Sequence, residues 1–237
     1  MVQGGGFIPV AFFRAILKFL KQNKNPKRNP KGGAKDMLRI TDTTDRKIFN
    51  SLDRWLQHAD KNQWIAGKAW YREAQAWCQE AANDFHIDPY KVAGVLSALS
   101  PNNKWERNKQ DAHSVINAHR YGLGAESVKC CTYNANKLKA FAILADKVSI
   151  SEKSPKTHSF AMNVGLLSPD HITADKWHIR ACLTRPEQGI TKTAESCTAA
   201  QYRRIEAVTV KLAHCHELKG YEAQAIIWCT IKDTWDR

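Results

Sequence analysis

Two residues that can do chemistry stand close together in the stretch SPKTHSFAMNVGLLSPDHITADKWHIRAC, from Ser154 to Cys182. Lys156 follows Pro155 at the expected start of a helix, where the positive end of the helix dipole favours loss of its proton and makes the amine a candidate nucleophile. Asp175 follows 19 positions later, at the expected start of another helix. Its carboxylate could stabilise a developing positive charge, and helix capping is its alternative role.

A polar turn forms a third candidate segment. The sequence LSALSPNNKWERNKQDA leaves an expected buried helix and passes through Ser100, Pro101, Asn102 and Asn103 into the next helix. Such a turn is commonly a plain connector between helices. Its side chains and amides could also contact a phosphate or a base.

Helical patterns dominate the chain after about residue 40. Cap-type residues open TDTTDRKIFNSLDRWLQHA, and NQWIAGKAWYREAQAWCQEAANDF continues the pattern. A helix starting at 88–89 has small and apolar residues on nearly every side, which predicts burial. Further helices are expected over about 104–119, 134–145, 156–164, 175–183, 197–216 and 221–235. No convincing alternation of apolar and polar residues indicates a strand, so the sequence predicts an all-α fold.

The distribution of charge points to a polyanion as partner. The 237 residues include 36 Lys and Arg against 23 Asp and Glu, a formal charge of +13. Residues 1–40 carry +8, because nine basic residues there face Asp36 alone. We therefore expect a basic arm (1–40) that binds a polyanion, ahead of an all-α domain (41–237), although solubility is another use for such charge. The arm residues expected to contact phosphates are Lys24, Lys27, Arg28 and Lys31.

The arm has two parts. The segment FIPVAFFRAILKFL is interrupted by Arg14 and Lys18 and is too short to span a bilayer. We interpret it as an amphipathic basic helix that packs on the domain, on a partner or on a membrane surface. Residues 21–36 have almost no apolar side chains and predict a flexible linker.

The seven cysteines form no C-x-x-C pair and no regular framework. This pattern argues against a secreted disulfide scaffold and a tetracysteine metal site, and it favours a reducing cytoplasm. The HCH stretch at 214–216, with His178 and Cys182, could supply metal ligands on paper, but adjacent residues of one helix point in different directions. We therefore expect no metal and no other cofactor. We also expect a monomer.

From Val92 onward the chain resembles the helix-hairpin-helix DNA glycosylase superfamily, especially its endonuclease III branch. That family has an LLSAQ-type buried helix followed by a polar turn, which VLSALSPNNKWERNKQDA resembles, and a Y-N-x-K-A-x-x-I helix, which YNANKLKAFAIL resembles. Its hairpin ends in Lys-Thr-Ala, and Lys156 with Thr157 stands at that place. Its V-D-x-H-x-x-R motif is similar to ADKWHIRAC, in which Arg180 follows Asp175 by five positions. The last helix, AQAIIWCTIKDTW, completes a resemblance over residues 92–235.

Two departures limit what the resemblance implies. The family's hairpin is Gly-rich, L-P-G-V-G, so that its backbone amides can approach a DNA phosphate. The matching stretch here, SISEKSP, has no glycine, and the basic arm could substitute for it. The cysteine loop C-x6-C-x2-C-x5-C is absent, so no iron–sulfur cluster is expected.

The resemblance implies a DNA glycosylase, with or without lyase activity, for a damaged or modified base in a bacterial or phage-infected cell. Asp175 would stabilise the oxocarbenium character of the sugar, and Lys156 would attack the anomeric carbon to form a Schiff base. A flipped base needs aromatic walls and a residue that fills the gap. Candidates for these contacts are Trp105, Trp177, His178, Leu99, Asn102 and Asn103. Further DNA contacts are expected from Lys104, Arg107, Lys153 and Arg180.

Two other functions fit the same sequence. The chain also resembles phage-encoded relatives proposed to act on hypermodified thymines, so the fold could modify or exchange a group on an unusual thymine. Alternatively, the glycosylase framework survives only as a scaffold, and the basic arm binds DNA without catalysis.

Overall fold

The structure, a computed structural model, describes residues 37–188 and 192–235. These residues are mainly helical, with single 3-10 turns and one isolated parallel bridge between Leu38 and Thr193. The all-α prediction is confirmed, since the described ranges contain no β-strand beyond that bridge. The α-helices are α2 (Asp45–His58), α3 (Lys61–Phe85), α4 (Pro89–Leu99), α5 (Trp105–Arg120), α6 (Asn134–Leu144), α7 (Pro155–Leu166), α8 (Lys176–Leu183), α9 (Ala199–Cys215) and α10 (Gly220–Trp235).

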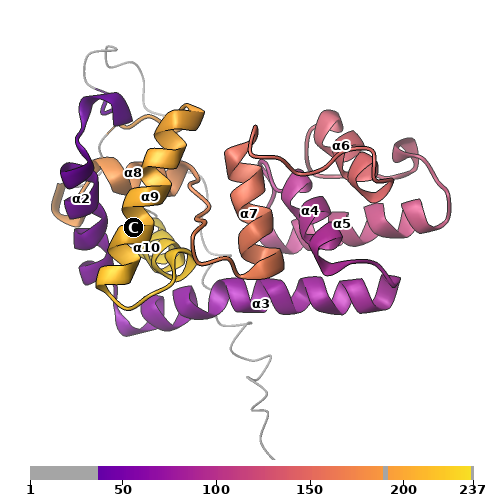
Figure 1. Ribbon diagram of the computed structural model, residues 1–237, viewed down its shortest axis with the longest axis horizontal. Helices are drawn as coiled ribbons and strands as arrows, with labels where there is room; N and C mark the ends of the chain where they lie inside the picture. The colour runs from indigo at the N-terminus through magenta and orange to yellow at the C-terminus, as the bar shows by residue number, and fades with distance from the viewer. Residues whose placement is uncertain (1–36, 189–191, 236–237) are drawn as a thin grey trace, which may run out of the picture.

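The long helix α3 connects two groups of helices (Figure 1). Its 25 residues span roughly 38 Å at the rise of an α-helix. On one half of α3 lie α2, α8, α9 and α10, which we call lobe A. On the other half lie α4, α5, α6 and α7, which we call lobe B. In chain order, α2 of lobe A comes first, the lobe B helices α4 to α7 follow α3, and the lobe A helices α8 to α10 come last.

Local signals in the sequence explain where α3 begins and how closely it packs. Asp60 and Gln63 form a capping box, in which each side chain accepts the backbone N–H of the other at 2.9 Å. A Cβ atom on Gly67 would lie 2.5 Å from the backbone of Ile226 in α10. Gly67 therefore allows α3 and α10 to approach each other more closely than any larger residue would.

Each lobe encloses its own hydrophobic core. In lobe A the apolar face of α2 is at most 1% exposed and packs against α8, α9 and α10. In lobe B, α4 is buried on nearly every side, as its sequence predicts. The buried apolar face of α2 consists of Ile48, Leu52, Trp55 and Leu56. The expected helices therefore agree with the structure in number, order and approximate bounds over the described ranges.

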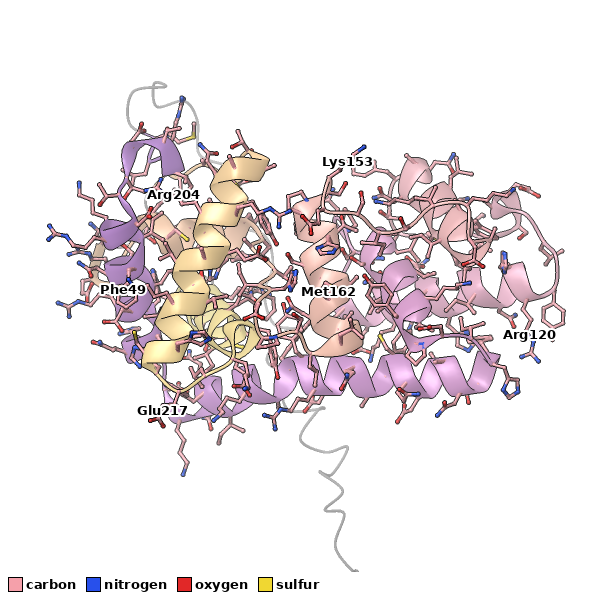
Figure 2. The ribbon with its side chains drawn as sticks, in the orientation of Figure 1. Phe49, Arg120, Lys153, Met162, Arg204 and Glu217 are labelled. Atoms are coloured by element: carbon pink, nitrogen blue, oxygen red, sulfur yellow. The ribbon has the colours of Figure 1, made fainter. Side chains whose placement is uncertain are left out.

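The folded part begins before the boundary predicted at residue 41. The N–H of Leu38 donates to the carbonyl of Lys192 at 3.1 Å, and its carbonyl accepts from Ala194 at 2.9 Å. Ile40 is buried in the core of lobe A, and Arg204 of α9, labelled in Figure 2, donates to its carbonyl at 3.1 Å. Residues 1–36, which include the predicted amphipathic helix and linker, lie outside the described residues.

The described helices carry neither cross-links nor a candidate membrane span. All seven cysteines are free thiols. Burial raises the pKa of the Cys78 and Cys229 thiols to about 12, so both remain protonated at neutral pH. No helix of the described ranges combines the length and the apolar character that crossing a bilayer requires.

Candidate active site

The half-buried Asp175 is the N-cap of α8, and three hydrogen bonds fix its carboxylate. Its Oδ1 accepts the backbone N–H groups of Trp177 at 2.9 Å and His178 at 3.0 Å. Its Oδ2 accepts the indole N–H of Trp228, on α10, at 3.1 Å. Capping explains the first two bonds, but the third also fixes the plane of the carboxylate. Because a carboxylate has about four acceptor positions, a ligand could still be accepted.

Trp228 connects Asp175 to a cluster of aromatic rings drawn from both lobes and α3. The centroid of the Trp70 ring lies 6.4 Å from Trp228, 5.2 Å from Trp105 and 6.3 Å from Phe160. Phe160 is buried, and the three tryptophans are half-buried. We call these four residues the aromatic cluster. Partly accessible rings of this kind can stack on a planar group.

The segment 168–175, which ends at Asp175, runs beside α7 in the direction opposite to the helix. Asn163 of α7 donates to the carbonyl of His171 at 2.8 Å. The His171 ring contacts His158, in the first turn of α7, with 5.3 Å between the ring centroids. The segment therefore returns from the C-terminal end of α7 towards the turn that carries Lys156 (Figure 1).

Lys156 is exposed in the first turn of α7, directly after Pro155, as the sequence predicts. The backbone of this turn is fixed to lobe B, because the hydroxyl of Ser97 donates to the carbonyl of Thr157 at 2.5 Å. Figure 2 shows Lys153 in the turn that leads into α7, at the same end of the helix. Lys156 and Asp175 are thus presented by different lobes.

The polar turn before α5 is organised by Asp111, a buried carboxylate. Asp111 accepts from the side chain of Asn103 at 2.9 Å and from the Nε of Arg107 at 2.7 Å. Asn102 is exposed in a left-handed conformation with φ of 59°, and its amide donates to the hydroxyl of Tyr133 at 3.0 Å. Asn102 therefore offers an accessible side chain, whereas Asn103 is held within the turn.

Two predicted substrate contacts lie inside the cores and need correction. Leu99 and His178 are both 0% exposed. The Nε2 of His178 lies 2.9 Å from the hydroxyl of Thr209, and burial lowers the pKa of His178 to about 3, so its ring is neutral. Neither side chain reaches the surface, because each occupies the inward face of its helix.

Trp177 and Arg180 form a stack at the edge of lobe A. The guanidinium carbon of Arg180 lies 4.7 Å from the centroid of the Trp177 ring and 5.3 Å from that of Trp235. The guanidinium also pairs with Glu195, and the side chain is only 14% exposed. Arg180 therefore offers little exposed surface to a DNA phosphate.

The remaining basic residues predicted to contact DNA fall into two groups. Lys104, Arg107 and Lys153 are exposed. The four predicted arm residues, Lys24, Lys27, Arg28 and Lys31, lie outside the described residues.

The described residues contain no candidate metal cluster, and two open hollows of the surface lie away from the site residues. Within 37–188 and 192–235, no group of three or more His, Cys, Asp or Glu residues could hold a metal ion. One open hollow runs along α9, lined by Arg203, Lys211 and other residues, and a second lies between α3 and α5. Neither includes Asp175 or Lys156, so the candidate site rests on the carboxylate and the aromatic cluster.

Trp70 and Trp228 are not among the site residues predicted from the sequence. Trp228 is 53 positions from Asp175, and no local pattern connects them. Trp70 lies in α3, where the helical period alone does not show that its ring remains partly accessible.

A profile described as "Family of unknown function (DUF7178)" matches residues 34–235, which cover all helices of both lobes. The chain belongs to this family. Neither a curated protein nor a solved structure matches the chain. The function of this DUF7178 member is therefore inferred from its own residues and their geometry.

Proposed function

We propose that this DUF7178 protein is a DNA glycosylase that releases a damaged or modified base, with Asp175 as its catalytic carboxylate. The observation that carries the proposal is the carboxylate of Asp175, fixed by three donors beside the aromatic cluster. The resemblance of residues 92–235 to helix-hairpin-helix glycosylases supports the same activity.

The chemistry follows from the charge that develops on the sugar. When the bond between the sugar and the base breaks, its electron pair leaves with the base and the sugar acquires oxocarbenium character. A carboxylate held in place before the reaction stabilises this positive charge without reorganising. Asp175 supplies such a group, and water completes the reaction, because its oxygen adds to the anomeric carbon and its proton goes to the released base.

Lys156 would provide the second route. Attack of its neutral amine on the anomeric carbon displaces the base and leads, after ring opening, to a Schiff base that permits strand cleavage. Its exposed position in the first turn of α7 leaves it accessible to a nucleotide. The same protein would then combine base release with lyase activity.

Base recognition is assigned to the aromatic cluster. A base must leave the duplex to reach Asp175, and stacking on half-buried rings compensates for the stacking that it loses. Trp105, a predicted wall, belongs to this cluster together with Trp70 and Trp228, and the exposed Asn102 is the remaining candidate for filling the gap. The exposed Lys104 and Lys153 would contact phosphates.

The decisive experiment measures base release from duplexes that contain uracil, oxidised pyrimidines or hydroxymethyluracil. Asp175→Asn keeps a side chain that can cap α8, so we expect an intact fold and a loss of base release of roughly a hundredfold or more. Asp170→Asn is the matched control, because Asp170 is exposed on the same segment. Full activity of Asp175→Asn on the substrate found would exclude Asp175 as the catalytic carboxylate.

Reduction with borohydride tests Lys156 separately. A Schiff base formed during the reaction becomes a stable covalent complex with DNA, which is visible on a denaturing gel. Lys156→Ala should abolish trapping, whereas Lys147→Ala, at an exposed lysine before α7 that is assigned no DNA contact, should retain it. Covalent trapping by Lys156→Ala would remove Lys156 from the mechanism.

One feature favours a second candidate, a modification or exchange reaction on a hypermodified thymine. The turn before α7 has no glycine, and its Glu152 pairs with Arg203 of α9 at 2.6 Å. An acidic side chain here does not favour the binding of a duplex phosphate. Mass spectrometry of nucleosides from treated modified DNA distinguishes the reactions, since exchange gives an altered nucleoside and a glycosylase gives free base.

A further inference from the structure

The backbone directly before Asp175 is held by the hydroxyl of Tyr202, on α9. This hydroxyl donates to the carbonyl of Ile172 at 2.7 Å and accepts the N–H of Ala174 at 3.1 Å. One side chain therefore bridges two backbone groups of an irregular segment. Ala174 adjoins Asp175, so a displacement of this contact is transmitted to the carboxylate.

Glu206, one turn further along α9, holds the same segment. Its Oε1 accepts the N–H of Ile172 at 3.2 Å and the hydroxyl of Ser159, on α7, at 2.8 Å. Its Oε2 lies 3.7 Å from a guanidinium nitrogen of Arg203. Glu206 therefore connects the segment before Asp175 to both lobes.

Tyr202 and Glu206 are both buried, so the loss of their hydrogen bonds would leave buried polar groups without partners. Tyr202 is 3% and Glu206 is 7% exposed. Burial raises the pKa of the Tyr202 hydroxyl above its ordinary value, so it stays protonated and can donate. A buried polar group is costly unless it is hydrogen-bonded. Here the partners are the backbone groups of Ile172 and Ala174, which have no helix or sheet to satisfy them.

We propose that Tyr202 and Glu206 are positioning residues that hold Ile172–Ala174 and thereby set the place of the Asp175 carboxylate against Trp228. This inference deepens the proposed function and rests on it where activity is concerned. The geometry itself can be measured independently of any activity, because the bond between Asp175 and the Trp228 indole reports the position of the carboxylate.

The first test replaces Tyr202 by Phe, which keeps the buried ring and removes the hydroxyl. We expect kcat for base release to fall roughly tenfold to a hundredfold, with KM changed by less than about twofold. Tyr221→Phe is the matched control, because Tyr221 is also buried and the charged groups near its hydroxyl, Arg72 and Glu222, belong neither to the segment nor to α9. Equal kcat values for Tyr202→Phe and wild type would overturn the assignment, as would an equal loss in the control.

Glu206 is tested by rescue. Glu206→Gln keeps an oxygen that can accept from Ile172 and Ser159, so we expect it to retain most of the kcat. Glu206→Leu removes the acceptor and should lower kcat by roughly tenfold or more. A purely electrostatic role would instead make Gln as damaging as Leu, because both lack the negative charge. Circular dichroism on both variants establishes that the helices remain.

The third measurement needs no activity. The indole N–H signal of Trp228 in a ¹⁵N–¹H spectrum, assigned with Trp228→Phe, should shift in Tyr202→Phe towards its position in Asp175→Asn. It should stay in place in Tyr221→Phe. An unchanged signal in Tyr202→Phe would refute the positioning role. If the wild-type protein releases no base while the signal shifts as expected, the proposed function fails and the positioning role stands.

Discussion

The carboxylate of Asp175 combines a structural role and a proposed chemical role, and at the residue scale two substitutions separate them. Asp175→Ala removes the acceptor for Trp177 and His178 and leaves the indole of Trp228 without its partner. Loss of an N-cap side chain costs about 1 kcal/mol of unfolding free energy. Asp175→Asn keeps an acceptor and should cost less than about half of that.

Urea denaturation of wild type, Asp175→Ala and Asp175→Asn measures these free energies. Both variants should lose base release, whereas only Asp175→Ala should lose the expected stability. An Asn variant as unstable as the Ala variant would mean that the negative charge or the bond to the Trp228 indole, and not the cap, stabilises α8, because the amide nitrogen of Asn cannot accept an N–H.

His178 gives the protein a stability that depends on pH. Burial lowers its pKa from 6.5 to about 3, so between these values the unfolded chain binds a proton that the folded chain does not. Its stabilising contribution is therefore fully present above about pH 6.5 and is lost as pH falls, by at most about 1.4 kcal/mol per pH unit. His178→Gln should flatten this dependence in urea titrations at pH 7 and pH 5. The exposed His214→Gln serves as control, and a slope that survives in His178→Gln would contradict the prediction.

At the scale of helices, the sequence specifies the elements well because their signals are local. The helix start at Asp88-Pro89 and the apolar patterns of α2 and α4 predict helix positions that agree with the structure to within a few residues. The site is less predictable, because its contacts join distant positions. Tyr202 and Ile172, or Asp175 and Trp228, meet only after α9 and α10 have packed into lobe A.

The contact between α3 and α10 leads to a prediction about packing. A methyl group on Gly67 would meet the backbone of Ile226 at 2.5 Å, so one helix must shift, and Gly67→Ala should destabilise the protein by about 1 to 3 kcal/mol. At Gly94 the nearest atom is the end of the Ile150 side chain at 3.1 Å, which can move. Gly94→Ala should be close to neutral, because Ala also favours the helix by up to about 1 kcal/mol. Thermal denaturation compares the two, and equal losses would contradict the packing argument.

At the scale of the whole molecule, α3 and the segment 168–175 fix the position of lobe A relative to lobe B. The proposed reaction requires this, because Lys156 comes from lobe B and Asp175 from lobe A. Asn163 of α7 and Tyr202 of α9 contact the segment from its two sides. A substrate between the lobes would therefore meet a pre-formed arrangement, not one assembled on binding.

A variant of the basic arm distinguishes two hypotheses, a glycosylase that uses the arm for DNA affinity and a protein that only binds DNA. Replacing the four predicted arm contacts, Lys24, Lys27, Arg28 and Lys31, by Gln removes four charges and leaves the described domain unchanged. If each contacts a phosphate, the slope of log affinity against log salt should decrease by about 3 to 4. For a glycosylase, this variant should raise KM and keep kcat, whereas Asp175→Asn should lose kcat and keep the salt slope. If the arm variant loses affinity while wild type and Asp175→Asn alike release no base from any substrate tested, the binding scaffold is the better account. An unchanged slope would instead assign the arm to a partner other than DNA.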